Sequence, residues 1–268
     1  MVYDILIVGG GIAGATAAIY GKMAGYNVAI IEKEEIGGKL NYIDDIYNYP
    51  GFYKIKGEML AEYLKIQLKE LKIEIIYDEV KSVRKISDTF NVCTEFSTYL
   101  SKYMIISTGS EPRKINNIKA SYCEMCDGHL YKNQNVSIIG GGDAAFSCAL
   151  YMSNISNTVY ILMRGPEPRA NRFLINKVLS KPNITIFSNV EVKEQNDDKL
   201  ILNDESTIKS DAVFVKIGST IDLNIFNNVI NDHNVFLSGD CRDERISQLI
   251  KCANDSIYVI EQIKLMNN

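Results

Sequence analysis

Two cysteines separated by two residues, Cys123 and Cys126, are the residues of this sequence whose spacing most directly predicts chemistry. A Cys-x-x-Cys pair can cycle between a dithiol and a disulfide, with one thiolate held near a redox partner while the other attacks a disulfide substrate. Asp127 follows directly, and its carboxylate can accept or return the proton that each half-reaction displaces. These three residues predict a catalytic thiol–disulfide centre.

Half of a zinc site is the alternative interpretation of the cysteine pair. A structural zinc ion takes four Cys or His ligands, and the sequence has no second Cys-x-x-Cys and no histidine cluster. We therefore expect no metal, and we interpret His129 as an ordinary polar residue. The other cysteines are isolated, and we expect small buried apolar side chains, not a disulfide framework, at Cys93, Cys148, Cys241 and Cys252.

A glycine-rich turn near the N-terminus has the spacing of a dinucleotide-binding loop. It follows an apolar strand over 4–8 and begins a helix over 12–24. Gly9 allows the tight turn, Gly11 lets the backbone approach a pyrophosphate, and Gly14 permits close packing of helix on strand. The helix N-terminus favours the phosphates, so this turn predicts a nucleotide site.

An acidic residue lies where such a site needs one. A second strand over 27–31 ends at Glu32, about 20 residues after the turn, where a carboxylate accepts hydrogen bonds from a ribose. The strand, helix and acidic residue together favour a nucleotide site over a merely structural glycine turn.

A second unit of the same kind lies further along the chain. Strands over 135–139 and 158–162 flank a glycine turn, Gly140 to Ala145, and a helix over 144–153. The chain then returns to the first domain through a strand over 234–240 and a final helix from about residue 248. We therefore predict an α/β fold of two Rossmann-like domains, one inserted into the other, with the bounds 1–112 and 217–268 for the first domain and 113–216 for the inserted one.

Composition agrees with a soluble enzyme. The 268 residues are 46% apolar, which allows two cores and leaves no room for a long disordered arm. We expect no signal peptide and no membrane span, and the cysteine usage fits a catalytic dithiol in a reducing cytoplasm. Basic residues are not interleaved with aromatic ones as in nucleic-acid modules, so we expect no nucleic acid partner.

The sequence resembles the low-molecular-weight thioredoxin reductases nearly from end to end. These are FAD proteins that carry a Cys-x-x-Cys in the inserted domain. The residues that carry the resemblance are Gly9 to Gly14, Gly37-Gly38-Lys39-Leu40, Asn48-Tyr-Pro-Gly51, Ser107-Thr-Gly109, Cys123 to Gly128, Gly140 to Ala145, and Gly239-Asp240 with Gln248.

The resemblance implies roles for individual residues and for partners. Cys126 would face the flavin, Cys123 would attack the thioredoxin disulfide, and Asp127 would move protons. Thioredoxin would be the substrate of a homodimeric flavoprotein oxidoreductase. The residues assigned to FAD binding are Gly9, Gly11, Ile12, Ala13, Gly14, Glu32, Lys33, Gly38, Lys39, Leu40, Asn48, Val80, Thr108, Gly109, Gly239, Asp240, Gln248 and Leu249.

The main departure from the family lies after the second unit's strand. Members that use NADPH carry His-Arg-Arg-x-x-x-Arg there, whereas this chain has Met163-Arg-Gly-Pro-Glu-Pro-Arg169. Losing charge-assisted contacts worth about 1.5–3 kcal/mol each would weaken NADPH binding strongly. A relocated phosphate site using Arg164, Arg169 and Arg172 is the alternative.

Without a nicotinamide, another reductant must supply the electrons. The resemblance then narrows to the ferredoxin-dependent flavin thioredoxin reductases of anaerobic bacteria, with FAD as cofactor. Residues 113–190 carry nine Lys or Arg against four acids, although the whole chain is at −4, and a basic surface attracts an acidic protein such as ferredoxin or thioredoxin. An NADPH-dependent reductase and a non-catalytic flavin redox sensor remain alternatives, and Tyr42 either covers the flavin or is a half-buried loop residue. We also expect the short segment 163–217 to lack a hairpin of the family's inserted domain.

Overall fold

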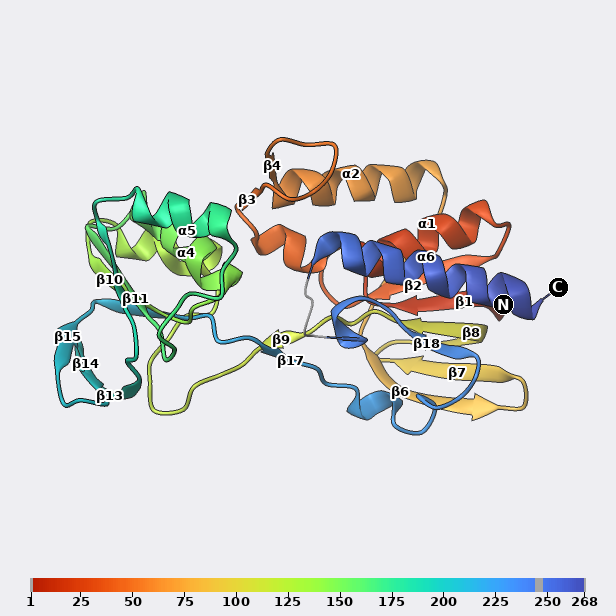
Figure 1. Cartoon of the computed structure of the whole chain (residues 1–268). Helices are drawn as coiled ribbons and strands as arrows, with labels where there is room; N and C mark the ends of the chain where they lie inside the picture. Colours follow the sequence, from red (N-terminus) through yellow and green to blue (C-terminus); the bar gives the residue numbers. More distant parts are fainter. Residues whose placement is uncertain (1, 244–247, 268) are drawn as a thin grey trace. The chain divides into compact units, whose positions relative to one another are not determined.

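The computed structural model describes residues 2–243 and 248–267 (Figure 1). The chain divides into two compact units. Unit 1 comprises residues 1–111 and 220–268, and unit 2 comprises residues 112–219. The expected boundaries, after residues 112 and 216, lie one residue and three residues from these. Short strands β9 (Glu111–Pro112) and β17 (Ser219–Thr220) pair with each other where the chain passes between the units.

Unit 1 is built on one mixed sheet. Its strand order is β5-β2-β1-β8-β7-β6, and β18 pairs with β8. The pairs β1·β2, β1·β8, β2·β5 and β8·β18 are parallel, whereas β6·β7 and β7·β8 are antiparallel. The strands are β1 (Val2–Val8), β2 (Val28–Glu32), β5 (Glu74–Tyr77), β6 (Val80–Ile86), β7 (Thr89–Thr94), β8 (Thr98–Ile106) and β18 (Val235–Leu237).

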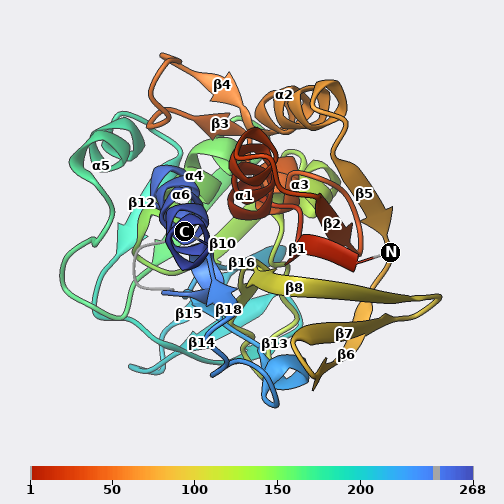
Figure 2. The same ribbon diagram turned by 90° about the vertical axis from the view of Figure 1, so that its right-hand side faces the viewer.

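Both faces of this sheet are covered, which explains why β1 is apolar along most of its length. Helices α1 (Ile12–Met23), α2 (Gly57–Glu70) and α6 (Leu249–Met266) pack on one face, with α1 and α6 side by side (Figures 1 and 2). Alternate side chains of β1 enter this core and the opposite one, where Phe90 and Phe226 are fully buried.

The parallel register brings the candidate nucleotide residues to one edge of the sheet. Val8 of β1 pairs with Ile31 of β2 and with Ile106 of β8, and Ile106 pairs with Leu237 of β18. The ends of these strands and the segments that follow them carry the glycine turn, Glu32, Ser107-Thr-Gly109 and Gly239-Asp240. Four separate stretches of sequence thus meet at the carboxyl edge, where α/β folds bind ligands.

Close packing of α1 on the sheet depends on one glycine. A Cβ atom on Gly14 would lie 1.9 Å from the Gly9 carbonyl oxygen. The Ser107 hydroxyl donates to the carbonyls of Val8 at 3.0 Å and Gly9 at 2.9 Å, which joins β8 to the turn. The role expected for Gly14 therefore agrees with its contacts.

Unit 2 has a parallel sheet of its own, in the order β12-β11-β10-β16. The elements are β10 (Asn135–Ile139), α4 (Asp143–Ser153), β11 (Thr158–Leu162), α5 (Arg172–Leu179), β12 (Ile184–Phe187) and β16 (Ala212–Val215). Two antiparallel hairpins form from β13 (Val192–Asn196), β14 (Lys199–Leu202) and β15 (Thr207–Lys209). They occupy the segment where we expected a hairpin to be missing.

Short elements complete the described chain. They are η1 (Gly38–Tyr42), β3 (Asp45–Ile46), β4 (Ile55–Lys56), α3 (Glu124–Asp127), η2 (Gly128–Tyr131), η3 (Asn224–Phe226) and η4 (Gly239–Cys241). In residues 2–243 and 248–267, no helix is long and apolar enough to span a membrane.

A buried carboxylate organises the corner after β5. Asp78 is 7% exposed and accepts hydrogen bonds from the Thr94 hydroxyl at 2.5 Å and from the N–H groups of Glu79, Glu95 and Phe96. Burial by itself raises the pKa of Asp78. The four hydrogen bonds lower it by more than burial raises it, so the pKa lies below its ordinary value. The charged carboxylate thus stabilises the fold.

We expect Asp78→Asn to lower stability at pH 7 and to flatten the acid branch of the stability curve. A depressed carboxyl pKa contributes stability that is present above the unfolded pKa, near pH 4, and lost as pH falls through the folded value. Urea unfolding from pH 7 to pH 2 measures both effects. Asp88→Asn, at an exposed turn, is the matched control, and equal acid branches for wild type and Asp78→Asn would contradict this role.

Candidate functional site

Glu32 lies directly beside the first glycine turn. Its side chain accepts hydrogen bonds from the N–H of Gly10 at 2.6 Å and of Glu34 at 2.8 Å, and the residue is 8% exposed. Gly11 differs from its neighbours, because a Cβ atom there would meet nothing within 4 Å. The turn therefore presents open backbone next to an oriented carboxylate, which fits the ribose and pyrophosphate of a dinucleotide.

Lys39 links two further segments at this edge. Its Nζ lies 2.7 Å from Asp240 Oδ2 and 2.6 Å from Ser110 Oγ. Gly38, with φ +52°, packs so closely that a Cβ atom would lie 3.3 Å from Gly11 Cα. Lys39 and Asp240, both expected at the FAD site, are therefore in contact beside the turn, although 201 residues separate them.

The side chains of Asn48 and Gln248 are also in contact. The Asn48 side-chain amide donates to Gln248 Oε1 at 2.8 Å across 200 residues of sequence. Gln248 directly precedes α6, and Leu249 is its first residue. Tyr42, at the end of η1, is 48% exposed.

The remaining candidate residues lie at the same edge or on α1, and one of them, Lys33, is exposed. Ile12, Ala13 and Leu40 are buried in the core below the turn, and Val80 is buried at the start of β6. Thr108 and Gly109 follow β8, and their backbone N–H groups face the Cys241 sulfur. Lys33 projects into solvent, and its Nζ lies 3.8 Å from Glu34.

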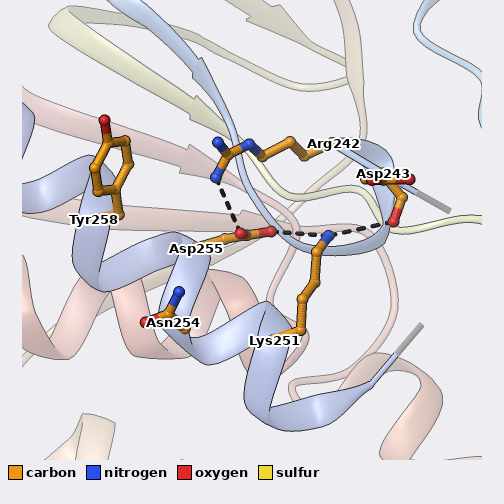
Figure 3. Close-up of a pocket in the computed structure, with 6 residues that line it drawn as sticks. All are labelled: Arg242, Asp243, Lys251, Asn254, Asp255 and Tyr258. Atoms are coloured by element: carbon orange, nitrogen blue, oxygen red, sulfur yellow. Dashed lines mark hydrogen bonds and ion pairs between the residues drawn. The ribbon is translucent and has the colours of Figure 1, made fainter. Parts of the chain in front are cut away.

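The turn that carries Gly239 and Asp240 is held by a cluster on α6 that sequence reasoning missed. Asp255, 5% exposed, pairs with Arg242 at 3.0 Å and Lys251 at 2.9 Å, and its carboxylate accepts from the N–H of Gly239 at 3.3 Å. Lys251 also donates to the Gly239 carbonyl at 2.9 Å. The cluster lines a hollow of about 360 Å³, formed by Arg242, Asp243, Lys251, Asn254, Asp255 and Tyr258 (Figure 3).

We expect Asp255→Ala to destabilise unit 1 and to weaken FAD retention. The change removes one acceptor from two cations and from a backbone N–H, at a cost of about 1–3 kcal/mol in unfolding free energy. Thermal unfolding and FAD release in urea measure the two losses. Glu261→Ala, which removes the exposed pair with Lys264 on the same helix, should change neither. Unaltered FAD retention in Asp255→Ala would rule out this role.

Cys123 and Cys126 form a disulfide around the start of α3, with their Cα atoms 5.3 Å apart. The Cys126 N–H faces Cys123 Sγ at 3.1 Å. Ser121 ties the predicted acid–base residue to this segment, because its hydroxyl donates to Asp127 Oδ2 at 2.6 Å and accepts from the Cys123 N–H at 3.1 Å. The three predicted catalytic residues therefore form one local unit. Among the described residues, no three His, Cys, Asp or Glu side chains group as a metal site would require.

The loop that follows β11 packs on the second glycine turn at Gly141, whereas a Cβ atom on Gly142 would meet nothing within 4 Å. Met163 is 2% exposed, and its Sδ would lie 3.1 Å from a Cβ atom on Gly141. The Arg169 N–H donates to the Gly141 carbonyl at 2.7 Å, and the Asn171 N–H donates to Asp143 Oδ1 at 2.7 Å. The loop is thus hydrogen-bonded to the turn through the Gly141 carbonyl and the Asp143 side chain. Asp143 also places an acidic group in the first turn of α4.

Comparison with known proteins places this arrangement in a family. The pyridine nucleotide-disulphide oxidoreductase family model matches residues 3–256. The thioredoxin reductase of Ureaplasma parvum is 33% identical over 290 residues, covering 96% of this chain and 94% of its own. That of Mycoplasma genitalium is 31% identical, covering 98% and 95%. The solved structure of T. acidophilum thioredoxin reductase superimposes with a TM-score of 0.92 at 26% identity, covering 99% of each chain. The chain therefore belongs to the pyridine nucleotide-disulphide oxidoreductases and, among them, to the low-molecular-weight thioredoxin reductases.

Proposed function

We propose that this thioredoxin reductase uses the Cys123–Cys126 pair as its redox relay and takes its electrons from reduced ferredoxin. FAD is the cofactor and, when bound, supplies the two electrons that convert the disulfide to the dithiol. Two protons are taken up in that step, and the dithiol then reduces the thioredoxin disulfide by exchange. Each turnover thus returns the Cys123–Cys126 disulfide.

Unit 1 has the side chains that a bound FAD requires. The open backbone at Gly11 and the helix N-terminus of α1 would hold the pyrophosphate, and Glu32 would accept from the ribose hydroxyls. Lys39, in contact with Asp240, would orient that carboxylate toward the ribityl and phosphate region. The Asn48–Gln248 pair would contact the ring system.

We assign different tasks to the residues of the dithiol segment. Cys123 would attack thioredoxin, and Cys126 would exchange electrons with the flavin. Asp127 would hold or release the displaced proton, and the Ser121 hydroxyl keeps its carboxylate beside the cysteine segment. The direct hydrogen bond from Ser121 to Asp127 supports the role of Asp127.

The observation that supports ferredoxin as the electron donor is the burial of Met163. This residue stands at the strand end where a nicotinamide site places a hydrogen-bonding or charged side chain, yet it is 2% exposed and packs on Gly141. A buried thioether offers no charge to a 2′-phosphate and no strong acceptor to ribose hydroxyls. Ferredoxin needs only a docking surface near the flavin, and the basic excess of residues 113–190 supplies charge complementary to an acidic protein.

An NADPH-dependent reductase is the second candidate. One observation favours it, because Arg169 lies beside the second glycine turn through its own backbone hydrogen bond to Gly141. Arg164, Arg169 and Arg172 are all exposed, and a well-placed arginine pair can bind a phosphate. We further propose a homodimer that works in the cytoplasm, in keeping with a dithiol that cycles in a reducing compartment.

Anaerobic turnover tests the proposal. The purified protein should carry one FAD per chain, and reduced ferredoxin should support continuous reduction of thioredoxin, measured by alkylation of the thioredoxin thiols. A folded protein without FAD would overturn the proposal. So would an FAD protein whose reduced form leaves thioredoxin oxidised, which is the behaviour of a redox sensor.

A further inference from the structure

A poorly exposed ion pair adjoins the redox disulfide. Lys216 Nζ lies 2.5 Å from Glu124 Oε2, and both side chains are only 15% exposed. Glu124 stands between the two cysteines in sequence, whereas Lys216 follows β16. Two other ion pairs of unit 2, Lys193–Glu205 and Lys209–Asp198, have side chains 44–75% exposed. Exposed ion pairs contribute little to stability, so the low exposure of the Lys216–Glu124 pair distinguishes it from the other two.

The Lys216 ammonium contacts the chain on both sides of Cys123. Besides Glu124, it donates to the Tyr122 carbonyl at 2.8 Å. The backbone of Lys216 is also held in place. Its N–H donates to the Ile139 carbonyl at 2.8 Å, and its own carbonyl packs so closely on Gly140 that a Cβ atom there would lie 2.2 Å from the oxygen. The sheet therefore holds the Lys216 ammonium against the two residues that flank Cys123 in sequence.

The thiol of Cys148, on α4, lies within the influence of the same two charges. Burial raises the pKa of this thiol well above its ordinary value, Glu124 raises it further, and Lys216 lowers it. Cys148 consequently stays a neutral thiol and does not compensate either charge. Asp127, the other acidic residue of α3, is hydrogen-bonded to Ser121. Lys216 is thus the cation that offsets Glu124.

We propose that Lys216 and Glu124 are positioning residues that set the dithiol–disulfide equilibrium of Cys123 and Cys126 in opposite directions. This inference rests on the proposed function, since it assumes that the pair is the redox relay. The disulfide is neutral, whereas the reduced pair carries thiolate character. A cation beside Cys123 therefore favours the reduced pair, and a carboxylate beside it favours the disulfide.

Equilibration of the oxidised holoprotein with dithiothreitol redox buffers tests this proposal without flavin turnover or thioredoxin. After acid quenching and alkylation, mass spectrometry of the Cys123–Cys126 peptide gives the reduced fraction. Lys216→Met should shift the equilibrium constant toward the disulfide by roughly three- to tenfold, and Glu124→Gln should shift it toward the dithiol by a similar factor. Lys216→Arg should retain the wild-type value, and Lys193→Met, which removes an exposed lysine of β13, is the matched control.

The opposite signs distinguish tuning from a merely structural role. Damage to the packing of α3 would move both single variants in the same direction, so that result, or the absence of any shift, would overturn the proposal. FAD content and the circular dichroism spectrum verify that each variant is folded. A wild-type pair that dithiothreitol cannot reduce and that does not re-form would instead overturn the relay itself, and with it both proposals.

Discussion

Cys123→Ser should abolish thioredoxin reduction while leaving FAD binding unchanged. The attacking thiolate is lost, and a serine hydroxyl cannot form the mixed disulfide through which exchange proceeds. Removing a nucleophile that works as one unit with its neighbours costs roughly a thousandfold or more in turnover. Thioredoxin thiols measured by alkylation give the rate, and flavin absorbance gives the cofactor content.

A matched substitution separates this effect from the general loss of a thiol. Cys93 is half-buried on β7 of unit 1, away in sequence from the dithiol, and is free in the structure. Cys93→Ser should therefore retain wild-type turnover and full FAD content. Full turnover by Cys123→Ser would show that the dithiol is not the relay, whatever the behaviour of the control.

The nucleotide turns could be predicted from sequence because their requirements are local. The glycines at positions 9 and 14 are required by a turn and a helix that lie only a few residues away. The helix expected over 12–24 is observed as α1 (Ile12–Met23). The strands expected over 135–139 and 158–162 are observed with those bounds. Spacing sufficed where the physical constraint acts within one βα unit.

Contacts between distant segments divide into two kinds. The Asn48–Gln248 and Lys39–Asp240 contacts join residues that the family resemblance had already assigned to one cofactor. Asp255 and Lys216 had no such guide, because an acid or a lysine in an ordinary helix or strand end looks like a solvated charge. Only the fold shows that Asp255 reaches the Gly239 turn and that Lys216 reaches the segment around Cys123.

NADPH, even at millimolar concentration, should reduce the flavin at least about a hundredfold more slowly than reduced ferredoxin does. Each lost charge-assisted contact weakens binding by roughly one to two powers of ten. In place of such contacts, this chain has the buried Met163 and a loop bonded to the glycine turn through Gly141 and Asp143. Hydride transfer also needs a stacked nicotinamide, a geometry that electron transfer from a docked protein does not require.

Anaerobic stopped-flow reduction with NADPH, NADH and reduced ferredoxin in turn measures this difference as the rate of flavin bleaching. Rate is decisive, because the retained Gly140-x-Gly142 turn could still bind a pyrophosphate without productive transfer. If the basic residues between positions 113 and 190 attract ferredoxin, the rate of reduction by ferredoxin should fall as salt is added, and Arg172→Glu should lower it at low ionic strength. Lys209→Glu, at an exposed position of β15 outside that range, is the control for a change of net charge alone. Rapid reduction by NADPH with no response to ferredoxin would refute the donor assignment, although the thioredoxin reductase assignment would stand.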